Sequence, residues 1–534
     1  MDRLLISAAH KSSGKTTLSI GLCAALSARG LAVQPFKKGP DYIDPMWLAR
    51  AAHRACYNLD PFLMGMDEIE RLFRRHALGA DLCLVEGNKG LYDGLALDGS
   101  NSNAALAAAL GLPVVLVVDA RGMTRGIAPL LLGYQAFDRS IRIAGVILNN
   151  LGGSRHEAKL RAVIEHYTDM TVVGAVHADE RLAIVERHLG LMPSNEAGAA
   201  DAQIARIGEA VAAQVDLDRV IDIARSASAW PVRLHGGVAS GAGVVSRAGV
   251  ESRAEVTSSA GVASGSGTGD VIPVTPPRPV ERRGRPRTRP ATVAPLVRSR
   301  PPRLRVGIAM DRAFGFYYAD DLTALRHAGA QIVPFDTLAD PCLPAVDALF
   351  IGGGFPEMLA PQLEANATLR ADIRAAIEDG LAVYAECGGL MYLARTLQVD
   401  GRRHAMVGAL PGDVVMHARP VGRGYVELAE TADMPWLAPA CPERSVRAHE
   451  FHYSSLENVD AAVRFAYRVR RGYGIDGRND GLVYRNVLAS YAHLRSVGAC
   501  AWAERFVAFA LQVKRQRAAG AQVSIPRQCR GLYG

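Results

Sequence analysis

The segment 9–17, which reads AHKSSGKTT, holds residue types that bind a nucleotide triphosphate. It matches the phosphate-loop pattern G-x-x-x-x-G-K-[ST], except that Ala9 stands where the first glycine is usual. In such a loop backbone N–H groups surround the phosphates, a lysine reaches the terminal phosphates and a hydroxyl ligates Mg²⁺. A tight turn that only caps a helix is the structural alternative. The predicted ATP-binding residues are Lys11, Gly14, Lys15, Thr16 and Thr17.

Acidic residues that follow the next predicted strands could serve Mg²⁺ and a substrate carboxylate. Asp41 and Asp44 lie three residues apart in KKGPDYIDP (37–45), where two prolines and a glycine predict irregular structure. Glu86 ends an apolar run, at the edge where open α/β sheets bind ligands, and is a predicted magnesium carboxylate. Asp93 follows in the loop 90–94. Alone, an Asp-rich turn is more often structural, but its place in a phosphate-loop domain favours a functional role.

A strand, a cysteine, two glycines and a helix follow one another in LAVYAECGGLMYL (381–393). This is the nucleophile-elbow arrangement with a thiol in place of the hydroxyl. At a helix N-terminus the dipole favours the thiolate, so Cys387 is the predicted nucleophile, with a buried packing thiol as the alternative. Earlier in the chain, the glycines of GGGFPE (352–357) suit an oxyanion hole, although a flexible turn explains them equally well.

A thiolate nucleophile needs a base, and the rear half of the chain offers several histidines. His493 lies in ASYAHLR (489–495), an apolar strand-like segment distant in sequence from Cys387, and is the predicted base. The HEFH cluster (449–452) is a weak metal signal because it has no further spaced ligands. For this cluster we expect a role around the substrate or at the domain interface. His404 and His417 are the other candidates for the base.

The elements that must position these residues alternate between apolar strands and helices, which predicts the α/β class with a parallel sheet covered on both faces. In the front half the expected helices are 18–26, 104–110 and 201–226. The expected strands are 4–6, 31–36, 82–86, 113–119 and 144–150 in the front half, and 304–310, 331–335, 348–351 and 381–386 in the rear half.

Length and charge predict two domains and a linker. The 534 residues are too many for one hydrophobic core. Residues 230–303 carry twelve Arg, no Lys and four acidic residues, and so account for the whole net charge of +8. Their Gly/Ala/Ser-rich and then Pro/Arg-rich composition predicts a disordered spacer rather than a nucleic-acid or membrane tether. We expect a phosphate-loop domain at 1–228, a disordered linker at 229–303, a second α/β domain that contains Cys387 at 304–514 and a basic tail at 515–534.

Composition disfavours several other classes of protein. Although 49% of the residues are hydrophobic, no run approaches the roughly 20 apolar residues of a membrane span. The eight cysteines include no C-x-x-C pair, which argues against a zinc ribbon or a disulfide framework. An apolar strand that begins within three residues of Met1 leaves no room for a secretion signal, so we expect a cytoplasmic protein.

Taken together, the motifs resemble those of the cobyrinate or hydrogenobyrinate a,c-diamide synthase family. The shared motifs are the phosphate loop, KKGPDYIDP, EGNKGLYDG, ERHLGL, GGGFPE, YAECGGLMYL and SYAHL, in this order. The resemblance implies a synthetase domain similar to dethiobiotin synthetase and a flavodoxin-like, class I glutamine amidotransferase domain. It also implies Mg²⁺, a tetrapyrrole substrate with acetate side chains, and a homodimer. Within ERHLGL, His188 by itself is expected to be structural.

The resemblance also implies roles for individual residues. Cys387 matches the glutaminase nucleophile and His493 its base. The usual triad has an acid two residues after the histidine, where this chain has Arg495, so the group that orients His493 stays open. The implied oxyanion residues are Gly353, Gly354 and Gly388, the implied magnesium ligands are Thr16, Asp41 and Glu86, and the implied carboxylate-activating residues are Asp41, Asp44 and Asp93.

The activity implied by the resemblance is ATP-dependent, glutamine-hydrolysing amidation of the a and c acetates of cobyrinate or hydrogenobyrinate, through an acyl phosphate, in cobalamin biosynthesis. No residue selects the macrocycle, so amidation of sirohydrochlorin, siroheme or nickel-sirohydrochlorin stays open. A partitioning-type nucleotide-switch ATPase is a further alternative, which the acidic GPDYIDP loop disfavours. The third alternative is a cysteine hydrolase in which the front half of the chain takes no part in the reaction.

Overall fold

The computed structural model describes residues 1–187, 190–196, 198–228, 304–436 and 445–520. The predicted linker, His188 and residues 521–534 lie outside these ranges. The described residues belong to one compact unit, within which we call 1–228 the front lobe and 304–520 the rear lobe. None of the described helices is long and apolar enough to cross a membrane.

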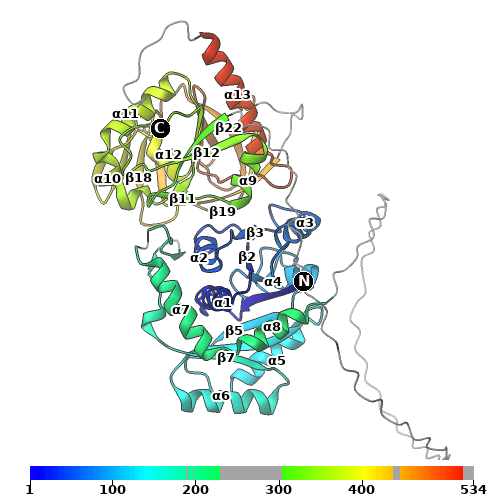
Figure 1. Cartoon of the computed structure of the whole chain (residues 1–534). Helices are drawn as coiled ribbons and strands as arrows, with labels where there is room; N and C mark the ends of the chain where they lie inside the picture. Colours follow the sequence, from blue (N-terminus) through cyan, green and yellow to red (C-terminus); the bar gives the residue numbers. More distant parts are fainter. Residues whose placement is uncertain (188–189, 197, 229–303, 437–444, 521–534) are drawn as a thin grey trace, which may run out of the picture. The chain divides into compact units, whose positions relative to one another are not determined.

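The front lobe contains a sheet of seven described strands (Figure 1). In chain order these are β1 (Asp2–Ala8), β2 (Val33–Lys38), β3 (Tyr57–Leu59), β4 (Leu82–Glu86), β5 (Val114–Asp119), β6 (Ile143–Leu151) and β7 (Val172–His177). Their order across the sheet is β3-β2-β4-β1-β5-β6-β7, and all these pairings are parallel, as predicted. Because the strands run the same way, the ends of β1, β2 and β4 meet at one edge of the sheet.

Helices cover both faces of this sheet (Figure 1). They are α1 (Lys15–Ala28), α2 (Ile43–Ala52), α3 (Met66–His76), α4 (Asn103–Leu110), α5 (Ile127–Phe137), α6 (Ser154–Tyr167), α7 (Ala200–Gln214) and α8 (Leu217–Arg225). Successive strand residues point to opposite faces, so Leu4 and Ile6 pack with α1, α2, α7 and α8, whereas Leu5 packs with α3 to α6. The lobe also contains a 3-10 helix, η1 (Glu180–Leu182), and two short strands, β8 (Glu186–Arg187) and β9 (Gly190–Leu191).

Two expectations for the front lobe were wrong in detail. The helix expected at 201–226 is divided into α7 and α8, because Val215 forms a bridge with Gly174 and Asp216 then caps α8 through the Arg219 amide. The irregular segment expected at 37–45 is shorter, since β2 continues through Lys38 and α2 begins at Ile43. A proline in the first helical turn loses no intrahelical hydrogen bond, which is why Pro45 is tolerated there.

The rear lobe contains a mixed sheet of nine described strands. In order across the sheet they are β12 (Ala330–Phe335), β10 (Leu304–Ala309), β13 (Ala348–Ile351), β15 (Ala382–Glu386), β24 (Val487–Ser490), β23 (Asn479–Tyr484), β22 (Arg464–Arg471), β19 (Gly422–Glu430) and β20 (Ser445–His452). The first five are parallel neighbours, and the pairings from β24 to β20 are antiparallel. The parallel half carries the predicted strands, whereas the antiparallel half had not been predicted.

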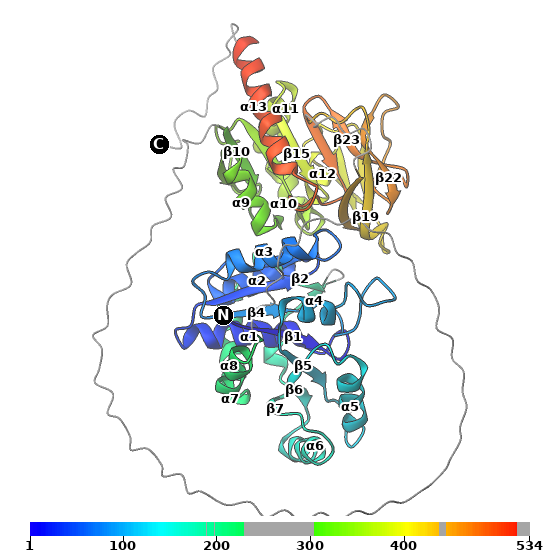
Figure 2. The ribbon, with the colours of Figure 1, turned by 90° about the vertical axis from the view of Figure 1, so that its right-hand side faces the viewer.

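Helices also cover both faces of the parallel part of the rear sheet. They are α9 (Ala319–His327), α10 (Ala360–Ala365), α11 (Ala367–Glu378), α12 (Gly388–Leu393), α13 (Trp502–Gly520) and the 3-10 helix η2 (Pro356–Leu359). Figure 2 shows α13 over β10 and β15 with α9 beside it. Because α13 continues to Gly520, residues 515–520 are helical and not part of a separate tail. The remaining strands are β11 (Phe314–Phe316), β14 (Gly353–Gly354), β16 (Thr396–Val399), β17 (Arg402–Ala405), β18 (Asp413–Met416) and β21 (Ser454–Glu457).

Two candidate active sites

The predicted phosphate loop joins β1 to α1, and Gly14 is the N-cap residue of that helix. Gly14 has a φ of 85°, in the left-handed region that favours glycine. A Cβ at Gly14 would lie 2.1 Å from Nδ2 of Asn149, and this amide donates to the Ser13 carbonyl at 2.9 Å. Asn149, near the end of β6, therefore packs against the phosphate loop at the N-terminus of α1 and fixes the position of the loop.

Beside this loop, a buried lysine is surrounded by three acidic side chains. Lys37, at the end of β2, has its Nζ 2.9 Å from Glu86 Oε1 and 3.6 Å from Asp41 Oδ2, and it also pairs with Asp44. Thr16 Oγ1 lies 2.6 Å from Glu86 Oε1 and 3.2 Å from Asp44 Oδ2. The structure thus brings four predicted residues together around Lys37. We call Thr16, Lys37, Asp41, Asp44 and Glu86 the charged cluster. Sequence reasoning missed Lys37, although its place between an apolar strand and an Asp-rich turn was a usable signal.

Pairing and burial set the charges in the charged cluster. Burial acts to lower the pKa of Lys37, but Asp44, Glu86 and Asp41 outweigh burial and raise this pKa well above its ordinary value. Burial acts to raise the pKa of Asp44, but Lys37 and Lys15 outweigh it and hold this pKa low. Burial and the neighbouring Asp44 raise the pKa of Asp41. For Lys15, burial and the charge of Lys37 lower the pKa, so a phosphate anion beside Lys15 would favour its charged form.

The charged cluster also fits a magnesium ion on chemical grounds. Oε2 of Glu86 is buried and has no hydrogen-bond partner among the described residues. Such an oxygen next to the Thr16 hydroxyl suits a hard cation that takes few protein ligands and several phosphate or water oxygens. Within the described ranges, no three Asp, Glu, His or Cys side chains are arranged to hold a metal by themselves. Asp41 instead accepts hydrogen bonds from the amides of Ile43 and Asp44 and so begins α2.

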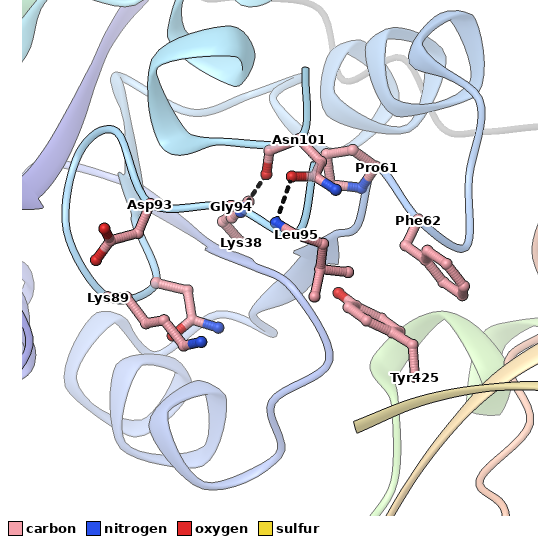
Figure 3. A pocket seen from close by; sticks show the side chains of 10 residues that line it. Lys38, Pro61, Phe62, Lys89, Asp93, Gly94, Leu95, Asn101 and Tyr425 are labelled. Atoms are coloured by element: carbon pink, nitrogen blue, oxygen red, sulfur yellow. Dashed lines mark hydrogen bonds between the residues drawn. The ribbon is translucent and has the colours of Figure 1, made fainter. Parts of the chain in front are cut away.

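Other predicted front-lobe residues lie around the charged cluster rather than within it. Lys11 is exposed in the phosphate loop, and Thr17 belongs to the first turn of α1. Asp93 is exposed, accepts the Gly90 amide at 2.9 Å, and lines a pocket with Lys38 and Lys89 (Figure 3). The roles expected for these residues stay predictions.

In the rear lobe, Cys387 lies between β15 and α12 with φ 46° and ψ −98°, a conformation that non-glycine residues rarely adopt. Its amide donates to the Ser490 carbonyl of β24 at 2.7 Å, which holds the turn in place. Burial and the negative charge of Glu357 raise the pKa of the Cys387 thiol. The geometry is that of a nucleophile elbow, and the resting thiol needs a base to become a thiolate.

The three predicted oxyanion glycines meet next to Cys387. A Cβ on Gly388 would lie 3.0 Å from the Gly354 nitrogen, and a Cβ on Gly353 would lie 2.6 Å from Cε1 of His493. The backbone of β14, the start of α12 and the His493 imidazole are therefore packed too closely for side chains at these positions. The structure brings the predicted nucleophile, base and oxyanion residues together, and the oxyanion role itself stays a prediction.

The acid nearest to the His493 ring is Glu386, the residue before the nucleophile. Its Oε2 lies 3.4 Å from His493 Nδ1, and its Oε1 accepts the Leu494 amide at 2.9 Å and the Tyr384 hydroxyl at 2.5 Å. Glu386 is only 2% exposed, so this carboxylate faces the imidazole away from water. Sequence reasoning missed Glu386 because its contact with His493 spans the fold, although the acid of the YAECGG motif was visible.

Arg495, which stands where the usual triad has its acid, points elsewhere. Its guanidinium donates to Asp320 Oδ2 at 2.6 Å and to the Asn58 carbonyl of the front lobe. The side chain of Asn58 in turn donates to the carbonyls of Gly39 and Asp41. Arg495 is therefore a buried structural cation that joins the end of β24 to the segment of the charged cluster.

The HEFH cluster lies next to His493, and among the described residues it forms no metal centre. The rings of His449 and His493 are stacked with centroids 5.0 Å apart, and the His493 amide donates to the His449 carbonyl at 2.8 Å. Burial, together with the His493 and Arg495 charges, lowers the pKa of His449 well below its ordinary value, so this ring is neutral. His452 hydrogen-bonds the Ser454 carbonyl, whereas His404 and His417 contact Glu364 and Ser455.

Comparisons with known proteins match the same two lobes. Residues 2–184 match the family model of an AAA domain, and residues 305–498 match that of a CobB/CobQ-like glutamine amidotransferase domain. A relative from Magnetococcus marinus, named cobyrinate a,c-diamide synthase, is 44% identical over 94% of this chain and 96% of its own length. A relative of the same name from Methanosarcina acetivorans is 38% identical over 93% of this chain and 93% of its own length. Another from Listeria innocua is 34% identical over 92% of this chain and 96% of its own length.

Proposed function

Because the chain belongs to the cobyrinate a,c-diamide synthase family, we propose that it amidates the a and c acetate side chains of cobyrinate or hydrogenobyrinate, using ATP and glutamine. It is a carbon–nitrogen ligase with glutamine as the amido donor, and its place is in cobalamin biosynthesis. The observation that carries the proposal is the pairing of two buried sites in one chain. One is a charged cluster at a phosphate loop, and the other is a strained cysteine beside a histidine.

The glutaminase step begins when His493 takes the proton of Cys387 and the sulfur attacks the side-chain amide carbon of glutamine. The N–H groups of Gly388 and of Gly353 or Gly354 hold the negative oxygen of the tetrahedral intermediate. The C–N bond then breaks, His493 returns its proton to the leaving ammonia, and water hydrolyses the thioester to glutamate. Glu386 orients the imidazole through Nδ1.

The synthetase step transfers the γ-phosphate of ATP to an acetate oxygen of the tetrapyrrole. Lys15 and the loop amides bind the phosphates, while Lys37 keeps Asp44 ionised and holds the side chains of Asp44 and Glu86 in place. Mg²⁺, held by Thr16 and Glu86, would supply charge neutralisation at the phosphates. Ammonia attacks the carbonyl carbon of the acyl phosphate, the C–O bond to phosphate breaks, and an amide and inorganic phosphate form.

Ammonia has to pass from the rear site to the front site. Because free ammonia is largely protonated at neutral pH and then cannot attack, the route has to be shielded from water. Tyr42, which adjoins the acids of the charged cluster in sequence, packs against His493 with ring centroids 5.2 Å apart. This contact between the two lobes supports a short route. A homodimer stays a prediction, and the mass of the native protein checks it.

The proposal is tested by incubating the full-length protein with ATP, glutamine and each tetrapyrrole in turn, followed by mass spectrometry. We expect two acid-to-amide changes on cobyrinate or hydrogenobyrinate, with ATP consumed for each amide. Lys15→Ala should abolish the amide and retain part of the glutaminase activity. If sirohydrochlorin alone is amidated, it is the substrate in place of cobyrinate and hydrogenobyrinate. Glutamine hydrolysis that needs no phosphate loop and yields no amide would instead indicate a cysteine hydrolase.

A further inference from the structure

A small cavity of about 80 Å³ lies at the same edge of the front sheet as the charged cluster. Its lining includes Lys38, Lys89, Asp93 and Tyr425 (Figure 3). Lys38 follows Lys37 in β2, and neighbouring residues of a strand point to opposite faces of a sheet. The charged cluster and the cavity therefore flank the end of one strand.

Lys38 is a buried cation without a carboxylate partner among the described residues. It is only 8% exposed, and its Nζ donates to the carbonyl of Asn101 at 2.6 Å. Burial lowers the pKa of Lys38 to about 8, while Asp60 and Asp93 act in the opposite direction. An ammonium group has three donors, so this side chain can still donate to an anion in the cavity. A buried charge without a counter-ion is costly to the fold and is therefore a candidate for function.

A second lysine reaches the same cavity from the loop that follows β4. Lys89 follows Glu86 by three residues and has a φ of 53°, which non-glycine residues rarely adopt. Within the described part of the chain it forms no ion pair with a carboxylate, and it is exposed at the cavity wall. Asn88, beside it, adds an amide to the lining. The end of a strand and a loop thus bring two cations and an amide to one small cavity.

The two carboxylates near this cavity already have other partners. Asp60 is buried and accepts the Tyr425 hydroxyl at 3.0 Å together with the amides of Phe62 and Leu63. Asp93 accepts the Gly90 amide at 2.9 Å through Oδ2. Neither acid forms an ion pair with the two lysines in the described structure, so the cavity keeps its preference for an anion.

We propose that Lys38 and Lys89 bind a carboxylate of the substrate other than the acetate that is being amidated. This inference rests on the proposed function, since a tetrapyrrole of this kind carries several carboxylates on one rigid ring. The cavity is too small for a macrocycle and large enough for one carboxylate group. An acid held there while another acid lies at the charged cluster would orient the ring and decide which acetate is phosphorylated.

The test measures binding of cobyrinate, followed by its visible absorbance, to full-length wild type, Lys38→Met and Lys89→Met without glutamine or ATP. We expect Lys38→Met to weaken binding about tenfold or more, because a charge-assisted contact is lost in a buried place. Lys89→Met should weaken it by about threefold, because exposed charges contribute less. Lys159→Met, on the exposed surface of α6, is the matched control and should bind like wild type.

The melting temperature of each variant, compared with that of wild type, reports whether the variant has folded. If Lys38→Met melts well below wild type, Lys38→Gln takes its place in the same titration. Wild-type affinity in folded variants of both lysines would overturn the proposal. The proposed function fails separately, if wild type binds cobyrinate through these lysines and yet forms no amide from it.

Discussion

The two sites are both buried, but the front site is built around the ion pairs of one lysine, whereas the rear site is built around a thiol with a raised pKa and a histidine with a lowered pKa. In the front lobe three acidic side chains each lie within ion-pair distance of the same lysine, Lys37. In the rear lobe the Cys387 thiol has a raised pKa, the stacked His449 is neutral, and Glu386 contacts the His493 ring. Burial therefore accompanies two different ways of activating a group in the two lobes.

The difference follows from the chemistry that each site is proposed to perform. Phosphoryl transfer has charge present from the start, so fixed ions in the right places stabilise it throughout. Amide cleavage by a thiol instead needs a proton moved at the moment of attack, and a permanently charged thiolate would be solvated poorly at Cys387. Variants that remove one site at a time should therefore separate cleanly into those that affect amidation and those that affect glutamine hydrolysis.

The largest expected effect separates the two sites completely. Cys387→Ser should lower glutamine-driven amidation by about a thousandfold or more, because the nucleophile is lost. Amidation driven by added ammonium chloride should stay near the wild-type rate, since the charged cluster is untouched. Both rates are measured by mass spectrometry of the tetrapyrrole product. Equal loss with ammonium would mean that the two sites are one functional unit.

The next effect tests whether the charges of the front site also stabilise the fold. Lys37→Met leaves Asp44 and Glu86 buried without their counter-ion and should cost about 3 kcal/mol or more of unfolding free energy, measured in urea. Lys514→Met, which removes a half-exposed pair with Asp347, should cost less than about 1 kcal/mol. Equal costs for the two variants would contradict a charged cluster held together by Lys37.

A smaller effect tests how the rear site positions its base. Glu386→Gln should lower the kcat of glutamine hydrolysis about a hundredfold with little change in the KM for glutamine, because the imidazole loses its orienting carboxylate. Tyr384→Phe removes a hydroxyl from the same carboxylate and should cost less than about fivefold. Ammonium-driven amidation and the melting temperature should stay unchanged in Glu386→Gln. An unaltered kcat would indicate that the backbone contacts of His493 alone orient its ring.

The smallest effect concerns pH. Because burial lowers the pKa of Lys38 to about 8, its charge is present below this pH and is lost above it. Cobyrinate binding to wild type should therefore weaken about tenfold between about pH 7 and pH 9, whereas binding to Lys38→Met should stay flat across this range. Titrations at both pH values measure this difference. A parallel slope in the two proteins would assign the dependence to another group.

What could be predicted from the sequence was what neighbouring residues impose on one another. The phosphate loop and the nucleophile elbow each lie within one short segment, and β1, β4, β5 and β6 were predicted close to their bounds. The same local reasoning failed at 201–226 and at 37–45, where a bridge to β7 and a helix start decided the structure. The antiparallel half of the rear sheet depends on pairings that short apolar patterns do not specify.

The amino-acid sequence by itself thus determined where the phosphate loop, the acidic turn and the nucleophile elbow lie, because the spacing of their residues within one short segment is enough to identify them. Only the tertiary structure decided what surrounds them. Glu386 meets His493 across 107 positions, Lys37 finds Glu86 on the neighbouring strand, and Arg495 pairs with Asp320. Electrostatic effects depend on distance in space and on burial, and both are set when strand ends from different parts of the chain meet at one sheet edge.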